Sequence, residues 1–307
     1  MVKIADAVDR AIAQRALYGT TGTAPGRLLA EGEGWTVHDV VCASGPADRP
    51  YEEQHSLVSI AIVAAGTFQY RSTTGHALMT PGSLMLGNIG ECFECGHEHG
   101  TGDRCIAFRY APGYFAQIAS EAGASATARK FTVPRLPALR ESTPVVADAC
   151  AALTGARDLS WDEIGVRLAA HVARQIDGVS PTRPGISSRM VERVTRSVRA
   201  IDADPARRLT LRQLAAEAEV SPYHFLRTFE QLTAVTPHQY VRRARLRAAA
   251  VRLLQEPAQV IDVAFDSGFG DLSNFNRAFR GEFGMSPRAY RQAGRRRSIT
   301  RSHAPKA

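Results

Sequence analysis

Five side chains of the kinds that bind transition metals gather in one short stretch of the first half of the chain: Cys92, Cys95, His97, His99 and Cys105. Thiolate sulfur and imidazole nitrogen are ligands that zinc prefers, and four of the five could complete a tetrahedral site. Alternate residues of an extended strand point to one side, so Cys95, His97 and His99 are expected to share a face. The stretch therefore predicts a site for one transition metal, such as zinc.

Other interpretations of this stretch stay open. Its spacing matches no standard zinc-finger pattern. Buried cysteines often act as small apolar residues, and reduced cysteines beside histidines can sense oxidants or electrophiles. The same residues could be purely structural, or could line a pocket for an organic effector.

The second half of the chain contains one short pattern twice, at a spacing of 50 residues. Because both copies keep aromatic, basic and proline residues at matching positions, they are expected to fold alike. The matching pairs are Phe225 and Phe275, Arg227 and Arg277, Phe229 and Phe279, Pro237 and Pro287, and Tyr240 and Tyr290.

Each copy predicts two short helices joined by a tight turn. In the first copy, Thr210 and Ser221 are expected to cap the two helices, with Pro222 opening the second. In the second copy, Gly268 fits the turn and Asp271 is expected to cap the next helix. Helical spacing turns six apolar side chains inward: Phe225, Phe229, Leu232, Phe275, Phe279 and Phe283. This is helix-turn-helix geometry, whose second helix enters the major groove of DNA.

Residues 237–255, between the copies, predict one long helix of about 28 Å at 1.5 Å per residue. Such a rod could hold two recognition helices about one DNA turn apart, roughly 34 Å. One chain would then read two adjacent major grooves on one face of a duplex.

The repeated residues of the two copies, with Ala264, Phe269, Gly284 and Ser286, resemble the signature of the DNA-binding domain of the AraC/XylS family of transcription regulators. The resemblance implies a regulator that binds double-stranded DNA at a promoter operator, more often an activator than a repressor, with RNA polymerase as a partner. It also implies that the outer faces of the two recognition helices read bases, through Tyr223, His224, Leu226 and Arg227 in the first and Ser273, Asn274, Asn276 and Arg277 in the second.

The charge of the chain divides in the same way. From Pro181 to the end there are 23 Arg and Lys against 11 Asp and Glu, whereas the first 180 residues have 15 against 19. A basic second half next to an acidic first half indicates nucleic acid as the partner of the second, through phosphate contacts.

The first half is expected to form short strands over residues 35–41, 57–64, 67–71, 76–79, 83–87 and 105–110. Strands at this spacing favour a sandwich or barrel. The segment from His55 through the TPGSLMLG run resembles the cupin-like effector domain that often precedes the DNA-binding half in the AraC family. This resemblance implies control by a small-molecule or metal effector.

The expected fold is a two-domain α+β chain. Its parts are a helical arm at 1–26, a cupin-like β domain at 27–135, trailing helices at 136–178, a linker at 179–188, a double helix-turn-helix domain at 189–292 and a basic disordered tail at 293–307. The trailing helices either make the contact of a homodimer, as in family relatives, or cover the sheet. Ser160 is expected to cap the second of them, with Glu163 as capping-box partner.

Several classes of protein are disfavoured. The N-terminus lacks the apolar core of a signal peptide, and no run of 18 apolar residues predicts a membrane span. Five cysteines without a secretion signal indicate reduced thiols in the cytoplasm.

No catalytic residue is predicted. The alternative is a cupin-type metalloenzyme fused to a DNA-binding module, because His97-Glu-His99 superficially resembles the start of a cupin metal motif. A DNA-repair regulator is disfavoured because its Pro-Cys-His-Arg acceptor context is missing.

Overall fold

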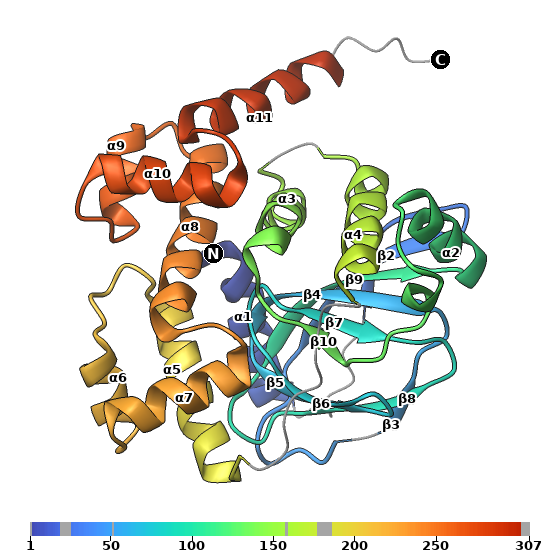
Figure 1. The fold of residues 1–307 in the computed structure, drawn as a ribbon, viewed down its shortest axis with the longest axis horizontal. Helices are drawn as coiled ribbons and strands as arrows, with labels where there is room; N and C mark the ends of the chain where they lie inside the picture. The colour runs from blue at the N-terminus through green and yellow to red at the C-terminus, as the bar shows by residue number, and fades with distance from the viewer. Residues whose placement is uncertain (1, 19–25, 51, 157–158, 177–185, 302–307) are drawn as a thin grey trace.

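The computed structural model describes residues 2–18, 26–50, 52–156, 159–176 and 186–301. It has the predicted two parts: a β-rich N-terminal domain with helices on its outside, and an all-helical C-terminal domain beside it (Figure 1). The predicted linker lies mostly outside the described residues, at 177–185.

The strands form two antiparallel sheets. The larger sheet has the order β1-β2-β9-β4-β7-β10, with β1 Gly26–Gly32, β2 Trp35–Cys42, β9 Asp103–Tyr110, β4 Val58–Gly66, β7 Leu84–Gly87 and β10 Arg135–Leu136. The smaller sheet has the order β3-β8-β5-β6, with β3 Glu52–Gln54, β8 Cys92–Gly96, β5 Phe68–Ser72 and β6 Gly75–Met79. This two-sheet arrangement is compatible with the cupin-like prediction.

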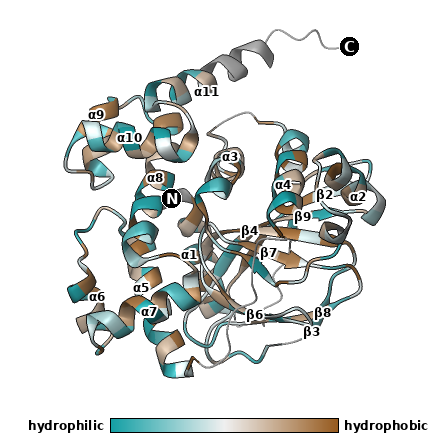
Figure 2. Ribbon diagram, viewed as in Figure 1, coloured by the Kyte–Doolittle hydropathy of each residue, from teal (hydrophilic) through white to brown (hydrophobic). Residues whose placement is uncertain are grey.

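The side chains of strand β9 pack into two different hydrophobic cores. Ile106 and Phe108 belong to the core under the outer helices, whereas Cys105 and Ala107 belong to the core between the sheets. The cause is the two-residue period of an extended chain, which sends successive side chains to opposite faces. In Figure 2 the hydrophobic residues of β4 and β7 lie at the centre of this domain.

Helices cover the outer face of the larger sheet. They are α1 Val2–Tyr18, α2 Pro112–Glu121, α3 Thr143–Leu153 and α4 Trp161–Gln175, with short 3₁₀ turns η1 Ala126–Arg129 and η2 Arg140–Ser142. The predicted capping box of α4 is wrong, because the Ser160 side chain makes no cap hydrogen bond. Helix α3 is sandwiched: Val146 and Ala149 pack on the sheet, and Ala147 packs against the C-terminal domain.

The C-terminal domain consists of α5 Ser188–Ala203, α6 Leu211–Glu217, α7 Pro222–Thr233, α8 Pro237–Gln255, α9 Val260–Asp266, α10 Leu272–Phe283 and α11 Pro287–Arg301. Two apolar clusters hold it together, one around Phe225 and Phe229 and one around Phe275 and Phe279, and α8 contributes to both. The two copies of the repeat therefore have separate apolar cores, and helix α8 packs into both.

The prediction of a disordered tail is wrong as far as Arg301, because α11 continues to that residue. Pro287 opens the helix, and the following run is rich in Arg, which is a good helix former, with no further proline before residue 305. Residues 302–307 lie outside the described residues.

Among the helices of the described ranges, none is both long enough and apolar enough to cross a membrane.

Candidate DNA-reading surface and buried cavity

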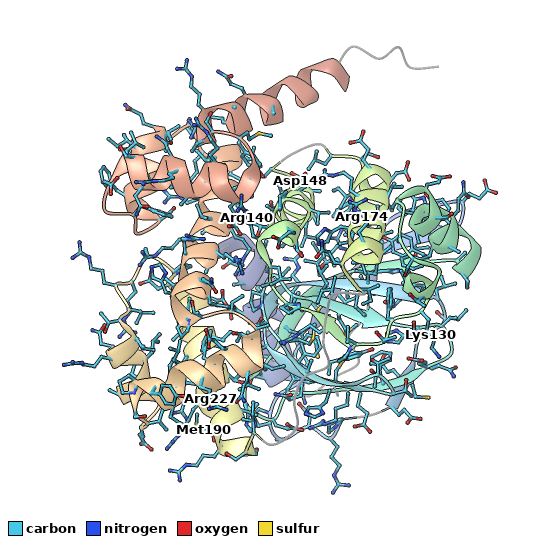
Figure 3. The ribbon with its side chains drawn as sticks, in the orientation of Figure 1. Lys130, Arg140, Asp148, Arg174, Met190 and Arg227 are labelled. Carbon is cyan, nitrogen blue, oxygen red and sulfur yellow. The ribbon has the colours of Figure 1, made fainter. Side chains whose placement is uncertain are left out.

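The second helix of the first motif is α7, and its N-terminal half faces solvent. Ser221 caps it by accepting a hydrogen bond from the backbone N–H of His224. Tyr223 is 71% exposed, and His224 and Arg227 are exposed as well, while Phe225 behind them is fully buried. Leu226 is only half-buried and lines a groove beside the helix. Figure 3 labels Arg227 on this helix.

The corresponding helix of the second motif is α10. Asp271 caps it by accepting from the backbone N–H of Asn274. Ser273, Asn274 and Arg277 are exposed, and Asn276 is half-buried. The predicted recognition residues of both helices are thus on the surface or at its edge, where side chains can reach base edges and phosphates.

One groove joins the two recognition helices. It has a volume of about 540 Å³, and Leu226 of α7 and Asn274 of α10 both line it. Arg242 and Arg245 of α8 lie between them in the same groove. Figure 1 shows α7 and α10 near opposite ends of α8. The two helices therefore border one basic, continuous surface.

Arg245 ties the two motifs together. Its guanidinium donates to the carbonyl oxygens of Pro205 at 2.7 Å and Arg207 at 3.0 Å, just before the first motif, and of Gly268 at 2.8 Å, in the turn of the second. Gly268 has a φ of 84°, and a Cβ there would come within 2.8 Å of the Ala206 carbonyl oxygen. The contact is thus close enough to set the orientation of one motif relative to the other.

Replacing Arg245 with alanine is expected to lower affinity for a duplex with two half-sites about tenfold, roughly 1.4 kcal/mol, because the two recognition helices lose their fixed orientation. Arg245→Lys is the matched control: it keeps the charge but cannot reproduce the planar fork of hydrogen bonds. Binding titrations on duplexes with one and two half-sites measure the effect. If lysine restored full affinity, the charge rather than the geometry would be responsible.

A cavity of about 340 Å³ lies between the two sheets of the N-terminal domain. Its apolar lining includes Val40, Ala61, Phe68, Met85 and Ala107, and it has polar groups toward both ends of β9. Asp103 is at the first residue of that strand, and Arg109 lies six residues further, about 20 Å along it. A small molecule with both apolar and polar parts suits such a space.

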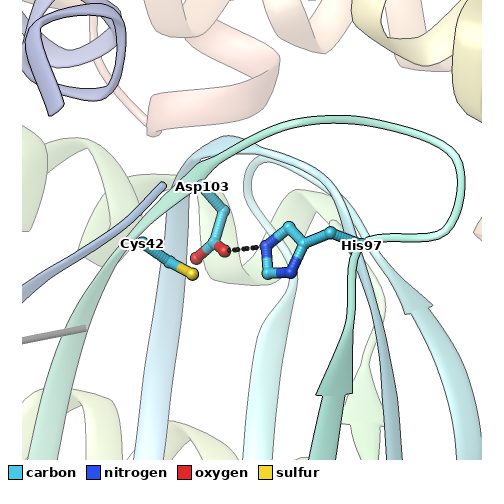
Figure 4. Close-up of side chains that lie close together, drawn as sticks. All are labelled: Cys42, His97 and Asp103. Atoms are coloured by element: carbon cyan, nitrogen blue, oxygen red, sulfur yellow. Dashed lines mark hydrogen bonds and ion pairs between the residues drawn. The ribbon is translucent and has the colours of Figure 1, made fainter. Parts of the chain in front are cut away.

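At the Asp103 end, three possible metal ligands converge (Figure 4). One ligand atom from each of Cys42, His97 and Asp103 lies within 4.8 Å of the other two. His97 Nε2 and Asp103 Oδ1 are 2.6 Å apart, and both side chains are buried. Cys105 Sγ donates to Asp103 Oδ2 at 3.4 Å.

The five predicted metal candidates are only partly brought together. Cys95, His97 and Cys105 line the cavity. Cys92 has the opposite parity from Cys95 on β8 and does not line it, and His99 instead borders a surface groove, with its Nε2 3.3 Å from Ser188 Oγ. The predicted common face of Cys95, His97 and His99 is wrong, because β8 ends at Gly96.

Cys42 and Asp103 were missed by the sequence prediction. They are partners across the β2–β9 pair, so they meet only once the strand register is known. The sequence held a weak signal: Cys42 directly follows the predicted strand over residues 35–41, and Asp103 stands two residues before the predicted strand over 105–110.

The titratable groups at the Asp103 end of the cavity differ in the causes of their pKa shifts. Burial opposes a charge on His97, but the hydrogen bond and negative charge of Asp103, together with Cys42, outweigh it and raise the pKa of His97 to about 9. Burial, followed by the charge of Asp103, holds the pKa of the Cys95 and Cys105 thiols well above the usual value. Those two cysteines are therefore poor thiolate nucleophiles, which disfavours them as redox sensors.

The opposite end of the cavity is lined by Glu53, His55 and Arg109. The His55 ring is stacked on Phe93 with centroids 4.1 Å apart, and its Nε2 is 2.8 Å from the Tyr70 hydroxyl. Burial and the charge of Arg109 lower the pKa of His55 to about 4, so this ring is neutral at physiological pH. Arg109 is thus the fixed positive charge among these three side chains.

The loop between β8 and β9 connects the cavity to the C-terminal domain. It begins with His97 and leads into Asp103. Arg199 of α5 donates to the carbonyl oxygen of Thr101 in this loop, and to Thr67 Oγ1 at 3.0 Å. The loop therefore contacts both the Asp103 end of the cavity and the helix that opens the C-terminal domain.

Comparisons with known proteins agree with the helical domain. A helix-turn-helix domain model matches residues 214–293. The HTH-type transcriptional activator RhaS of Klebsiella pneumoniae (strain 342) is 38% identical over 87 residues, 28% of this chain and 31% of that protein. The bifunctional transcriptional activator/DNA repair enzyme AdaA of Bacillus subtilis (strain 168) is 33% identical over 92 residues, 30% of this chain and 44% of that protein.

Among solved structures, the DNA-binding domain of AdpA, the global transcriptional factor, in complex with a target DNA, is 29% identical. The match covers 36% of this chain and 97% of that structure, with a TM-score of 0.33. The chain spans less than half the length of the two curated relatives described above. The helix-turn-helix model covers most of the repeat region, and that region is therefore an AraC-type helix-turn-helix domain.

Proposed function

We propose that this chain, with its AraC-type domain, is a sequence-specific transcription regulator that binds a promoter operator through α7 and α10. The observation that carries the proposal is the arrangement of two capped helices with exposed polar faces along one groove, oriented by α8 and Arg245. Helices spaced in this way suit two adjacent major grooves of double-stranded DNA. The excess of Arg in this half suits phosphate and guanine contacts.

The signal for this regulator is received in the cavity of the N-terminal domain. A ligand can change DNA occupancy only if it binds two docking states of the domains with different affinity. The contact of Arg199 with the β8–β9 loop supports such a link, because the loop borders the cavity and α5 belongs to the DNA-binding half. The effector is either a small organic molecule or a metal ion.

Activation through RNA polymerase and assembly as a homodimer belong to the same proposal. RhaS is named as an activator, which supports activation over repression. Of the two trailing helices predicted for the dimer contact, α4 is the better candidate, because eight of the eleven residues of α3 are buried within the chain. Helix α4 keeps Val166 and Arg167 exposed on its outer side.

A cupin-type metalloenzyme is the competing function. It would need His97 and His99 to point at one ion. His97 lines the cavity, but His99 is directed to a surface groove beside α5. This divergence favours a regulator over an enzyme.

The test is a selection of bound sequences from random duplexes, with and without added zinc. The proposal expects a site of two half-sites about 10 base pairs apart, centre to centre, whose enrichment changes with the effector. Recovery of all sequences in proportion to their input would contradict it, because a non-specific basic domain behaves in that way.

A further inference from the structure

A three-residue site stands at the Asp103 end of the cavity, and it differs from the cluster that the sequence predicts. It combines a thiol from the end of β2, an imidazole from the first residue after β8 and a carboxylate from the start of β9. We propose that Cys42, His97 and Asp103 hold one divalent metal ion of the zinc type, with a coordination position open to the cavity. This inference deepens the proposed function, since it names the regulatory ligand, but the metal site itself does not depend on DNA binding.

The donor set fits zinc better than other abundant cations. A thiolate disfavours magnesium and calcium, which prefer oxygen ligands only, while sulfur, nitrogen and carboxylate oxygen are all zinc ligands. One thiolate and one carboxylate also balance the two positive charges of the ion, so the loaded site is neutral in a buried place. The ion would displace the proton between His97 and Asp103 and the proton of the Cys42 thiol.

The geometry requires only a small rearrangement, in which the hydrogen-bonded His97–Asp103 pair, 2.6 Å apart, opens to admit the ion. The ligand atoms lie within 4.8 Å of one another, whereas zinc bonds of 2.0–2.3 Å place tetrahedral ligand atoms about 3.5 Å apart. Three protein ligands leave one position for water or an effector atom, as in zinc sites that bind a further ligand. Because all three residues line the cavity, that position can face a molecule bound there.

Surrounding contacts connect the site to the DNA-binding half. The loop that runs from His97 to Asp103 also carries Gly100 and Thr101, which lie against Arg199 of α5. An ion that replaces the His97–Asp103 hydrogen bond would move the two side chains apart and so change the shape of this loop. Its occupancy is therefore expected to change the docking of α5, and with it the affinity for the operator.

The experiment is a titration of the metal-free full-length chain with Co²⁺, followed by absorption spectroscopy. The variants are Cys42→Ser and, as a matched control, Cys92→Ser, which makes the same chemical change at a residue of β8 that does not line the cavity. The wild type and Cys92→Ser are expected to bind one equivalent, with a thiolate-to-cobalt charge-transfer band. Cys42→Ser is expected to lose that band and to bind at least about 100-fold more weakly.

Loss of the band in Cys92→Ser, or its persistence in Cys42→Ser, would overturn the assignment. If Cys42→Ser does not fold, Asp103→Asn takes its place. Saturating Zn²⁺ should then raise the melting temperature of the wild type and leave that of Asp103→Asn unchanged, because only an ion bound to the native state stabilises it. An equal rise in both proteins would also overturn the site.

A second readout separates the metal site from the regulator. Zn²⁺ should change operator affinity in the wild type and Cys92→Ser but not in Cys42→Ser. Co²⁺ binding at Cys42 with no change in operator affinity would overturn the link through the loop. A chain that binds the operator but no Co²⁺ overturns the metal site alone, whereas one that binds Co²⁺ but no specific DNA overturns the regulator alone.

Discussion

Replacing Glu282 with alanine is expected to destabilise the helical domain by about 3–5 kcal/mol, the usual cost of removing one partner of a buried ion pair. The Glu282 side chain is 1% exposed and lies 3.3 Å from Arg243 Nε on α8. Thr143 Oγ1 of α3 donates to its carboxylate at 2.7 Å. Without the carboxylate, the Arg243 guanidinium would remain buried with a carbonyl partner, the Ala138 oxygen at 2.8 Å.

Because Glu282 joins α10, α8 and α3, its loss also loosens the docking of the two domains. Urea unfolding followed by circular dichroism measures the effect as a lower midpoint of the helical transition. Glu230→Ala is the matched control, since Glu230 is exposed on α7 and surface changes of this kind usually stay within about 0.5 kcal/mol. A Glu282→Ala midpoint equal to that of Glu230→Ala would show that the buried pair contributes nothing.

Replacing Arg277 with alanine is expected to weaken operator binding by about 1–3 kcal/mol, or roughly 5- to 150-fold. Arg277 is exposed on α10, where an arginine can contact guanine through two hydrogen bonds. Its loss should also relax the sequence preference at one or two positions of the second half-site. Competition binding against a panel of operators with single substitutions measures both effects.

Arg288→Ala is the control for charge, because Arg288 is exposed at the start of α11 and outside the recognition helix. It should lower the affinity for all sequences alike, if at all, as the loss of a phosphate contact does. An unchanged preference in Arg277→Ala would mean that α10 does not enter the groove in the proposed way.

The helical domain could be predicted from sequence almost residue by residue, since its signals are local. Proline and a capping side chain mark the start of α7 and α8, and the phenylalanines follow helical spacing. The exception is α11, where the strong positive charge suggested disorder while helix propensity extended the helix. Charge density predicts solvation of a segment, but not the absence of a helix.

The cavity could be predicted only in part. The strands over residues 58–66 and 103–110 follow clear apolar patterns, yet the approach of Cys42 to Asp103 depends on the register of β2 against β9. The extended strand expected at Cys95 forms as β8 but ends at Gly96, so His97 and His99 lie beyond it and do not share its face. Strand parity and strand ends decide which of the five cysteine and histidine candidates meet, and composition specifies neither.

The most direct test of two recognition helices on one rod is the dependence of binding on half-site spacing. Inserting about 5 base pairs, half a helical turn, moves the second half-site to the opposite face of the duplex. Because α8 and Arg245 fix the helices relative to each other, affinity should fall to that of a single half-site. Equal affinity for the original and the lengthened operator would contradict the claim that α7 and α10 grip adjacent grooves as one rigid unit.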